Sequence, residues 1–327
     1  MRVLLTGANG HVGANTAREL LNRGHEVVAF VRSTSDLRGL DGLDLDYAQG
    51  DVTNGESVKS AAEGCDAIVH TAAVYQWWTK DMESIAVTAV EGAKNVLEAA
   101  KHVRIQRVVY TSSVVAIGTT TDPETVLTVD HWNDNAHTQY AKAKTHSERE
   151  AWKMAKAYDI PMIVLCPGTV FGPLDYKITP STALILGMAD GTGQSFDSGL
   201  AAVDVRDVAR IHAQAVERGE TGKRYAIVGK NVTLKQLGET VSKYTGKEVK
   251  HFGASPAIGK VVAGIMELGA RFTGKPPVLT RALIDDYAGR YQFVDATPTK
   301  TEFDWSPIEF QDTVRDTVDW LAGISER

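Results

Sequence analysis

The sequence has few cysteines, no excess of positive charge and no long uninterrupted apolar run. Its two cysteines, Cys65 and Cys166, are far apart in apolar surroundings, so we expect buried thiols and neither a disulfide nor a metal site. Lys and Arg number 35 against 41 Asp and Glu, and the formal net charge of −6 offers no basic surface to a nucleic acid. We therefore expect a small-molecule partner.

No stretch reaches the roughly 18 uncharged apolar residues that a membrane span requires, which predicts no membrane partner. The first apolar run begins at residue 2 and leaves no room for a signal peptide, so we expect a cytoplasmic protein. The sequence also lacks internal repeats and a Pro/Ser-rich linker. Its 327 residues exceed what one hydrophobic core usually fills, which predicts a main domain with a smaller companion.

Three glycines spaced by three stand near the N-terminus, between a short apolar run (residues 2–6) and a stretch of helical periodicity (residues 14–21). Such glycines let the backbone approach a pyrophosphate, whose charge sits on the helix N-terminus. A glycine triplet alone also fits an ordinary strand-to-helix turn, but this position favours a dinucleotide. The predicted cofactor contacts are Thr6, Gly7, Asn9, Gly10, His11, Val12 and Gly13.

The end of the second predicted strand, residues 26–31, bears on the choice of cofactor. Arg32 stands where an NAD enzyme usually has an acid for the ribose hydroxyls, and an arginine there favours a 2′-phosphate and hence NADP. A solvated arginine is the alternative. The nearby Asp36 also leaves NAD open.

Two further strand ends extend the predicted cofactor site. Asp51 and Val52 follow the third strand, where the aspartate could hold the adenine amino group or merely begin a turn. Thr71, Ala72 and Ala73 follow the fourth strand, and small residues there let a cofactor pass closely. The loop beyond contains Tyr75, Trp77 and Trp78, which could form a flat wall for an aryl substrate or seal the core.

Tyr140 and Lys144 are four residues apart, so both project from one face of a predicted helix. An ammonium beside a phenol favours the phenolate and makes the hydroxyl a better proton donor or acceptor near neutral pH. Ser113 follows the fifth strand, residues 107–111, and stands 27 residues before Tyr140. These residues together indicate a site for proton transfer beside the cofactor.

These motifs identify the chain as similar to the extended short-chain dehydrogenase/reductases, whose marks are Thr6-Gly7-x-x-Gly10-x-x-Gly13, a strand-end serine and Tyr-x-x-x-Lys. Within that family the sequence resembles the dihydroflavonol reductase and cinnamoyl-CoA reductase branch. The stretches that carry the resemblance are residues 109–113, 129–134, 140–148, 151–153 and 167–173, with a later echo at 203–209.

The resemblance implies that Tyr140 is the catalytic acid/base, that Lys144 lies beside it and on the nicotinamide ribose, and that Ser113 orients the substrate carbonyl. Gly118, five positions after Ser113, favours Ser113 over Ser112, whose hydroxyl is expected to bond to backbone. The same resemblance implies a nicotinamide pocket shaped by Pro167, Gly168 and Val170.

The alternation of strands and helices predicts an α/β fold, a doubly wound Rossmann-type parallel sheet with a smaller, interleaved C-terminal substrate lobe. Residues 1–173 with about 201–230 would form the dinucleotide-binding domain, and about 174–200 with 231–327 the substrate lobe. We expect residues 202–205 at the edge of the main sheet. The apolar stripe of Ile258, Val261, Val262, Ile265 and Leu268 is expected in the core or in a pocket lid.

The predicted function is NADPH-dependent reduction of an aldehyde or ketone, bulky and aromatic or alicyclic. One alternative is an NAD-dependent nucleotide-sugar epimerase or dehydratase, or a hydroxysteroid dehydrogenase, and another is a non-catalytic NADP-binding regulator. Residues 178–199 contain no Lys or Arg, which argues against a nucleotide sugar, and the presence of Tyr140 and Lys144 argues against a regulator. The oligomeric state, including a homodimer, stays open.

Overall fold

The computed structural model describes residues 1–72, 83–253, 255–273, 277 and 279–325 of the chain. Its centre is a seven-stranded sheet in the order β10-β6-β5-β4-β1-β2-β3, with parallel neighbours throughout, which confirms the predicted doubly wound α/β fold. The strands are β1 (Arg2–Thr6), β2 (Glu26–Val31), β3 (Asp46–Gln49), β4 (Ala67–His70), β5 (Arg107–Thr111), β6 (Met162–Pro167) and β10 (Arg224–Ile227).

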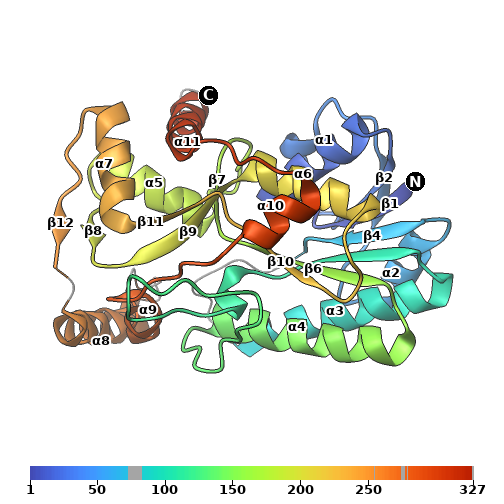
Figure 1. Ribbon diagram of the computed structural model, residues 1–327, viewed down its shortest axis with the longest axis horizontal. Coiled ribbons are helices and arrows are strands. Elements are labelled where there is room, and N and C mark those ends of the chain that lie inside the picture. The colour runs from blue at the N-terminus through green and yellow to red at the C-terminus, as the bar shows by residue number, and fades with distance from the viewer. Residues whose placement is uncertain (73–82, 254, 274–276, 278, 326–327) are drawn as a thin grey trace.

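Helices cover both faces of this sheet (Figure 1). One face carries α1 (His11–Asn22) and α6 (Val205–Glu217), and the other carries α2 (Gly55–Ala62), α3 (Glu83–Val103) and α4 (Gln139–Tyr158). Central strands such as β4 and β6 are buried along their whole length, as expected for parallel strands covered on both sides. Short 3₁₀ helices, η1 (Arg38–Leu40) and η2 (Val114–Ala116), follow β2 and β5. Because all seven strands are parallel, their carboxyl ends lie at one edge of the sheet.

A second group of elements lies beside the sheet and has its own core, which includes Phe171, Ile185, Leu237 and Val314 (Figure 1). A three-stranded sheet contains β7 (Thr169–Phe171), β9 (Gly199–Asp204) and β11 (Lys230–Thr233), and a two-stranded one contains β8 (Ser195–Phe196) and β12 (His251–Phe252). The helices of this part are α5 (Pro180–Asp190), α7 (Leu234–Thr245), α8 (Pro256–Thr273), α9 (Arg281–Tyr287) and α11 (Phe310–Ser325). Helix α10 (Thr297–Phe303) instead packs against β10 of the main sheet.

The structure corrects the prediction for residues 202–205. Strand β9 pairs in parallel with β7 and antiparallel with β11, so it belongs to the smaller sheet and not to the edge of the main one. A fully buried apolar strand has the same sequence pattern in either sheet, which is why the pattern misled. Helix α6, directly after β9, does return to the main sheet and packs against α1. The division into two domains stays a prediction.

Helix α8 corrects a second prediction. The side chains of its apolar stripe are 40–68% exposed, so their expected placement in the core is wrong. The stripe consists of Ile258, Val261, Val262, Ile265 and Leu268. Helical periodicity identifies an amphipathic helix but does not say which surface covers it. A role as a pocket lid stays a prediction.

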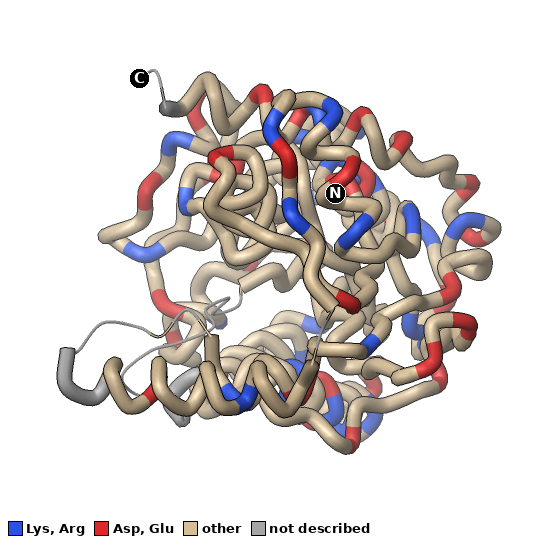
Figure 2. The backbone as a smooth tube through the Cα atoms, turned by 90° about the vertical axis from the view of Figure 1, so that its left-hand side faces the viewer, with Lys and Arg blue, Asp and Glu red and all other residues tan. Residues whose placement is uncertain are grey.

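Charged residues of both signs are interspersed over the side of the molecule shown in Figure 2. Among the described residues, exposed ion pairs join Arg149 with Asp134 and Arg315 with Asp312. Exposed pairs of this kind each contribute little stability. The described helices include none with the length and apolar character of a membrane span.

Candidate active site

The glycine turn lies at the carboxyl end of β1 and leads directly into α1, whose N-cap is Gly10. Gly7 has a φ of +73°, and a Cβ added there would lie 2.7 Å from the backbone nitrogen of Ala72, so only glycine fits. A Cβ on Gly13 would lie 2.1 Å from the carbonyl oxygen of Gly7, so α1 packs closely on the turn only with glycine here. No side chain caps α1, and its first turn has no acidic residue. The turn therefore fits a pyrophosphate.

Two buried residues of α1 tie the turn to the loop after β7. The imidazole Nε2 of His11 and the side-chain amide nitrogen of Asn15 lie 3.1 Å and 3.3 Å from the carbonyl oxygen of Pro173. The Nδ1 of His11 is 3.9 Å from the buried carboxylate of Asp175. Burial lowers the pKa of His11, with Asp175 opposing, so the imidazole is neutral at pH 7. The loop that follows β7 is thus held beside the N-terminus of α1.

Arg32 is exposed directly after β2, as the sequence predicts. The nearby Asp36 accepts three hydrogen bonds from the guanidinium of Arg38, at 2.7–3.1 Å, which lower the pKa of Asp36 to about 2. Lys177 interacts electrostatically with this group. Burial lowers the pKa of Lys177 most; the charge of Arg32 lowers it further, and that of Asp36 raises it. The adjacent Tyr176 ring lies 5.0 Å from the Arg38 guanidinium. No sequence motif links Lys177 to Arg32, so sequence analysis missed it.

Ser113 follows β5 and is the N-cap of η2, where its hydroxyl accepts a hydrogen bond from the Val115 N–H at 3.3 Å. Its side chain is buried, as is that of Ser112. Helix α4 packs against η2, so the end of β5 and the start of α4 meet at the carboxyl edge of the sheet. This is the edge that also carries the glycine turn.

Tyr140 lies in the first turn of α4, which begins after Thr138, whose hydroxyl accepts a hydrogen bond from the Ala141 N–H. The Tyr140 side chain is half-buried. One turn later, the buried Lys144 donates a hydrogen bond from Nζ to the carbonyl oxygen of Thr111 at 3.0 Å. That carbonyl is two residues before Ser113. The structure thus joins the helix of the predicted Tyr-x-x-x-Lys motif to the strand end of the predicted serine.

Three buried titratable side chains surround this junction. Burial lowers the pKa of Lys144 to about 8, against an opposing effect of the Glu148 carboxylate. Burial lowers the pKa of His70 to about 3 and that of His212 to about 4, and in each case the charge of Lys144 contributes. At pH 7 both imidazoles are neutral and most Lys144 is protonated. An ammonium near the Tyr140 phenol favours the phenolate.

The carboxylate of Glu148, one turn beyond Lys144, is fully buried and carries a network that sequence analysis missed. It accepts hydrogen bonds from the Ser112 hydroxyl at 2.5 Å and the Trp152 indole N–H at 3.2 Å, and it pairs with Arg224 on β10 at 2.7 Å. The Ser112 hydroxyl therefore bonds to a side chain, so the expected bond to backbone is wrong. Arg224 also donates to the carbonyl oxygens of residues 129 and 131. The network fastens β5, α4 and β10 together.

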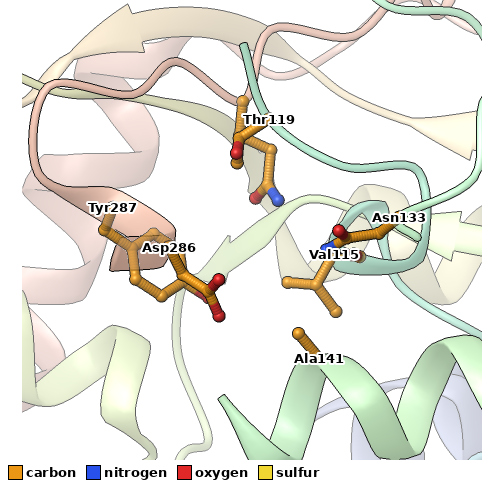
Figure 3. A pocket seen from close by; sticks show the side chains of 7 residues that line it. Val115, Thr119, Asn133, Ala141, Asp286 and Tyr287 are labelled. Atoms are coloured by element: carbon orange, nitrogen blue, oxygen red, sulfur yellow. Dashed lines mark hydrogen bonds between the residues drawn. The ribbon is translucent and has the colours of Figure 1, made fainter. Parts of the chain in front are cut away.

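Helix α9 reaches the start of α4 through Asp286. Its buried carboxylate accepts hydrogen bonds from the backbone N–H groups of His137 at 2.9 Å and Thr138 at 2.8 Å, and its Oδ1 lies 2.9 Å from the His137 Nδ1. A small pocket opens here, and Figure 3 shows Asp286 and Tyr287 on one side and Asn133 and Ala141 on the other. Sequence analysis singled out none of these residues for the site, because they lie far apart in the chain.

For three other predicted cofactor residues, Asp51, Thr71 and Gly168, the structure shows contacts within the chain. Asp51 accepts hydrogen bonds from the N–H and hydroxyl of Thr53, at 2.9 Å and 2.8 Å, which is the turn that the sequence left open. Thr71 donates two hydrogen bonds to the carbonyl oxygen of Thr6. A Cβ on Gly168 would lie 2.2 Å from the Ala201 carbonyl oxygen. Cofactor contacts of these residues stay predictions. Ala73, Tyr75, Trp77 and Trp78 lie outside the described residues.

Comparisons with known proteins agree with this architecture. The NAD dependent epimerase/dehydratase family matches residues 3–228. Sterol demethylase protein B of Methylococcus capsulatus is 31% identical over 267 residues, which are 80% of each chain. A dihydroflavonol 4-reductase-like protein of Synechocystis sp. is 35% identical over 249 residues, 74% of this chain and 72% of the relative. Cinnamoyl-CoA reductase 1 of Petunia hybrida is 33% identical over 258 residues, 74% and 77% of the two chains.

Solved structures are similar over almost the whole chain. The crystal structure of gox2253 has a TM-score of 0.86 and 31% sequence identity, and 98% of each chain is covered. The UDP-glucose 4-epimerase of Thermus thermophilus, solved in complex with NAD, has a TM-score of 0.77 and 20% identity over 99% of each chain. The second likeness shows the fold alone.

Proposed function

Because the chain belongs to the NAD dependent epimerase/dehydratase family, we propose that it is an NADPH-dependent reductase of aldehyde and ketone carbonyls. The family and the relatives are NAD(P)-dependent oxidoreductases of the extended short-chain dehydrogenase/reductase type. Relatives at 30–35% identity include dihydroflavonol 4-reductase-like and cinnamoyl-CoA reductase proteins, and this supports a bulky aromatic or alicyclic substrate.

The charges after β2 support NADP over NAD. Asp36 is the acid that could bind the ribose hydroxyls of NAD, and its carboxylate is bound by Arg38. Burial lowers the pKa of Lys177 most, and the like charge of Arg32 lowers it further, a repulsion that an anion between the two would remove. A 2′-phosphate would relieve that repulsion and accept hydrogen bonds from both side chains.

Three side chains carry the proposed reaction. NADPH, when bound, supplies the hydride to the carbonyl carbon. Tyr140 donates its phenolic proton to the carbonyl oxygen as negative charge develops there, and the Ser113 hydroxyl donates a hydrogen bond to the same oxygen. The ammonium of Lys144 then stabilises the phenolate that Tyr140 becomes. The neutral His70 and His212 do not compete for this charge at pH 7.

One observation carries the proposal, the hydrogen bond of 3.0 Å between Lys144 Nζ and the Thr111 carbonyl oxygen. This bond holds the Lys144 ammonium at Thr111, two residues before Ser113 in the chain. Lys144 itself lies one helical turn after Tyr140. A lysine needed only for solubility would be exposed, whereas this one is buried with a lowered pKa. Perturbed pKa values of this kind are typical of catalytic sites.

The direct test is Tyr140→Phe, which keeps the ring and removes the proton donor. Turnover of a reduced ketone should fall by about two to four orders of magnitude, while NADPH affinity measured by fluorescence stays within about twofold. Tyr158→Phe removes a hydroxyl at the far end of the same helix and serves as the matched control. Near-normal turnover in Tyr140→Phe would refute the assignment.

A second candidate, hydroxysteroid dehydrogenase activity, is favoured by one observation, the 31% identity to sterol demethylase protein B. A screen of NADPH and NADH consumption against aryl ketones, aldehydes, flavanonols and keto-steroids separates the two. Preference for aryl ketones or flavanonols with NADPH supports the first proposal. Exclusive use of a keto-steroid with NADH would replace it with the second.

A further inference from the structure

More than half of the large apolar side chains that are exposed in the described part of the chain lie on one helix, α8. They are the five of the apolar stripe and the neighbouring Met266, which is 41% exposed. Single exposed apolar side chains are normal on a soluble protein. A contiguous group of this size marks a surface that another molecule covers.

Helix α8 lies at the edge of the molecule and packs against α9 (Figure 1). Two ion pairs fasten it there, because Lys260 Nζ lies 2.6 Å from the Asp285 carboxylate and the Glu267 carboxylate lies 2.8 Å from the Arg281 guanidinium. Lys260 and Glu267 are the charged residues within 256–270. Since both are paired with α9, the stripe presents an uncharged face to its surroundings.

This charge pattern decides against two kinds of occupant. A helix that lies on a membrane surface carries several Lys and Arg along its polar face, whereas residues 256–270 have one lysine, which is paired. A nucleic acid needs a basic surface, and the formal net charge of this chain is −6. The stripe therefore fits an uncharged apolar surface of a protein.

The spacing of the stripe indicates the shape of that surface. Apolar side chains recur at intervals of three, four and three residues, at Ile258, Val261, Ile265 and Leu268. These are the a and d positions of a heptad repeat, and such a seam packs against the a and d side chains of another helix. A second copy of the chain supplies a helix with the same seam, its own α8.

The area of the stripe predicts how strong such a contact is. A fully covered aliphatic side chain buries about 120 Å², so six that are about half exposed offer on the order of 400 Å² in each copy. Two copies would then bury about 800 Å² through these side chains, which is the low end for a specific interface. A contact of this size is weak and reversible.

We propose that two copies of this chain associate through the α8 stripe, helix against helix about a two-fold axis. Such a contact uses the same surface on both copies, so it covers both stripes at once and closes at a dimer. The proposal does not depend on the proposed function, because the stripe contains none of the residues assigned to the cofactor or the carbonyl group.

Sedimentation velocity of the full chain, from about 1 µM to about 200 µM, tests the proposal. The wild type should shift from monomer toward dimer with a Kd of about 10–100 µM, as expected of so small an interface. Ile265→Glu should stay monomeric at every concentration, because the dimer would bury its carboxylate without a partner. Ile265 is 68% exposed in one copy, so its replacement should change Tm by no more than about 2 °C.

Val87→Glu is the matched control, since Val87 on α3 is 63% exposed and lies outside the stripe. It should associate as the wild type does. Both native cysteines are buried, so a short bis-maleimide should join two copies of Ile265→Cys and leave Val87→Cys monomeric.

Three outcomes overturn the proposal. A dimer that survives Ile265→Glu, or that Val87→Glu abolishes, uses another face of the molecule. A wild type that is monomeric throughout, and whose substrate KM rises in Ile265→Glu, has a stripe that covers the substrate. A monomeric wild type that sediments with phosphatidylcholine vesicles, while Ile265→Glu does not, has a stripe that binds lipid.

Discussion

Replacing Glu148 with glutamine should move the alkaline limit of catalysis, because its carboxylate raises the pKa of Lys144. Side chains one helical turn apart are separated by about 6 Å. At an effective dielectric constant of about 20, opposite unit charges at that distance interact by about 3 kcal/mol, which corresponds to about two pKa units. The proposed reaction needs protonated Lys144, whose pKa is about 8 in the native protein. The fall of kcat/KM at high pH should therefore move down by about one to two units in Glu148→Gln.

The same substitution should cost stability, since it leaves the buried Arg224 without its carboxylate partner. Breaking one half of a buried ion pair typically costs about 3–5 kcal/mol in the free energy of unfolding, which urea denaturation at pH 7 can measure. Glu150→Gln is the matched control on α4, because Glu150 pairs with Lys153 near the surface, and it should change neither quantity noticeably. If Glu148→Gln loses stability but keeps the wild-type pH profile, the electrostatic reasoning about Lys144 is wrong.

Two further predictions concern the cofactor site and the buried histidines. Lys177→Ala should weaken binding of 2′,5′-ADP about tenfold or more, the effect of losing one charge-assisted hydrogen bond. Binding of 5′-AMP, measured in the same way by calorimetry, should stay unchanged. Equal losses for both nucleotides would mean that Lys177 has a structural role. The pKa values of His70 and His212 are about 3 and 4 in the folded protein, below the ordinary value of 6.5, so the unfolded chain takes up protons first as the pH falls. The free energy of unfolding should then decrease below pH 6.5 by up to about 1.4 kcal/mol per pH unit for each histidine, and urea titrations that give a flat profile between pH 6.5 and 4 would contradict this.

The main sheet could be predicted from sequence because its signals are local. Apolar runs bounded by glycine give the strands, and the glycine turn gives the first strand, turn and helix in order. The Tyr140 and Lys144 spacing gives one helix face directly. Each of these features depends on residues within one helical turn or one strand, and periodicity reports such neighbours well.

The parts that the sequence did not reveal depend on partners far apart in the chain. The charge of Lys177 interacts with that of Arg32 after β2, Asp286 binds the start of α4, and Arg224 pairs with Glu148, each across 76 to 149 residues. The prediction for strand β9 was wrong for the same reason, because the sequence of a buried apolar strand does not identify the strand that pairs with it. Exposure of the α8 stripe is likewise a matter of tertiary contacts and not of periodicity.

The hydrogen bonds between Asp286 and the start of α4 have a consequence for folding during synthesis. Its acceptor oxygen for the Thr138 N–H is synthesised 148 residues after that group. A growing chain can therefore pair β1 through β6 while the first turn of α4 still lacks the carboxylate that holds it. During synthesis the strands of the nucleotide-binding sheet up to β6 are thus complete before α4 is held in place, and a chain cut short before α9 should bind nucleotide yet turn over poorly.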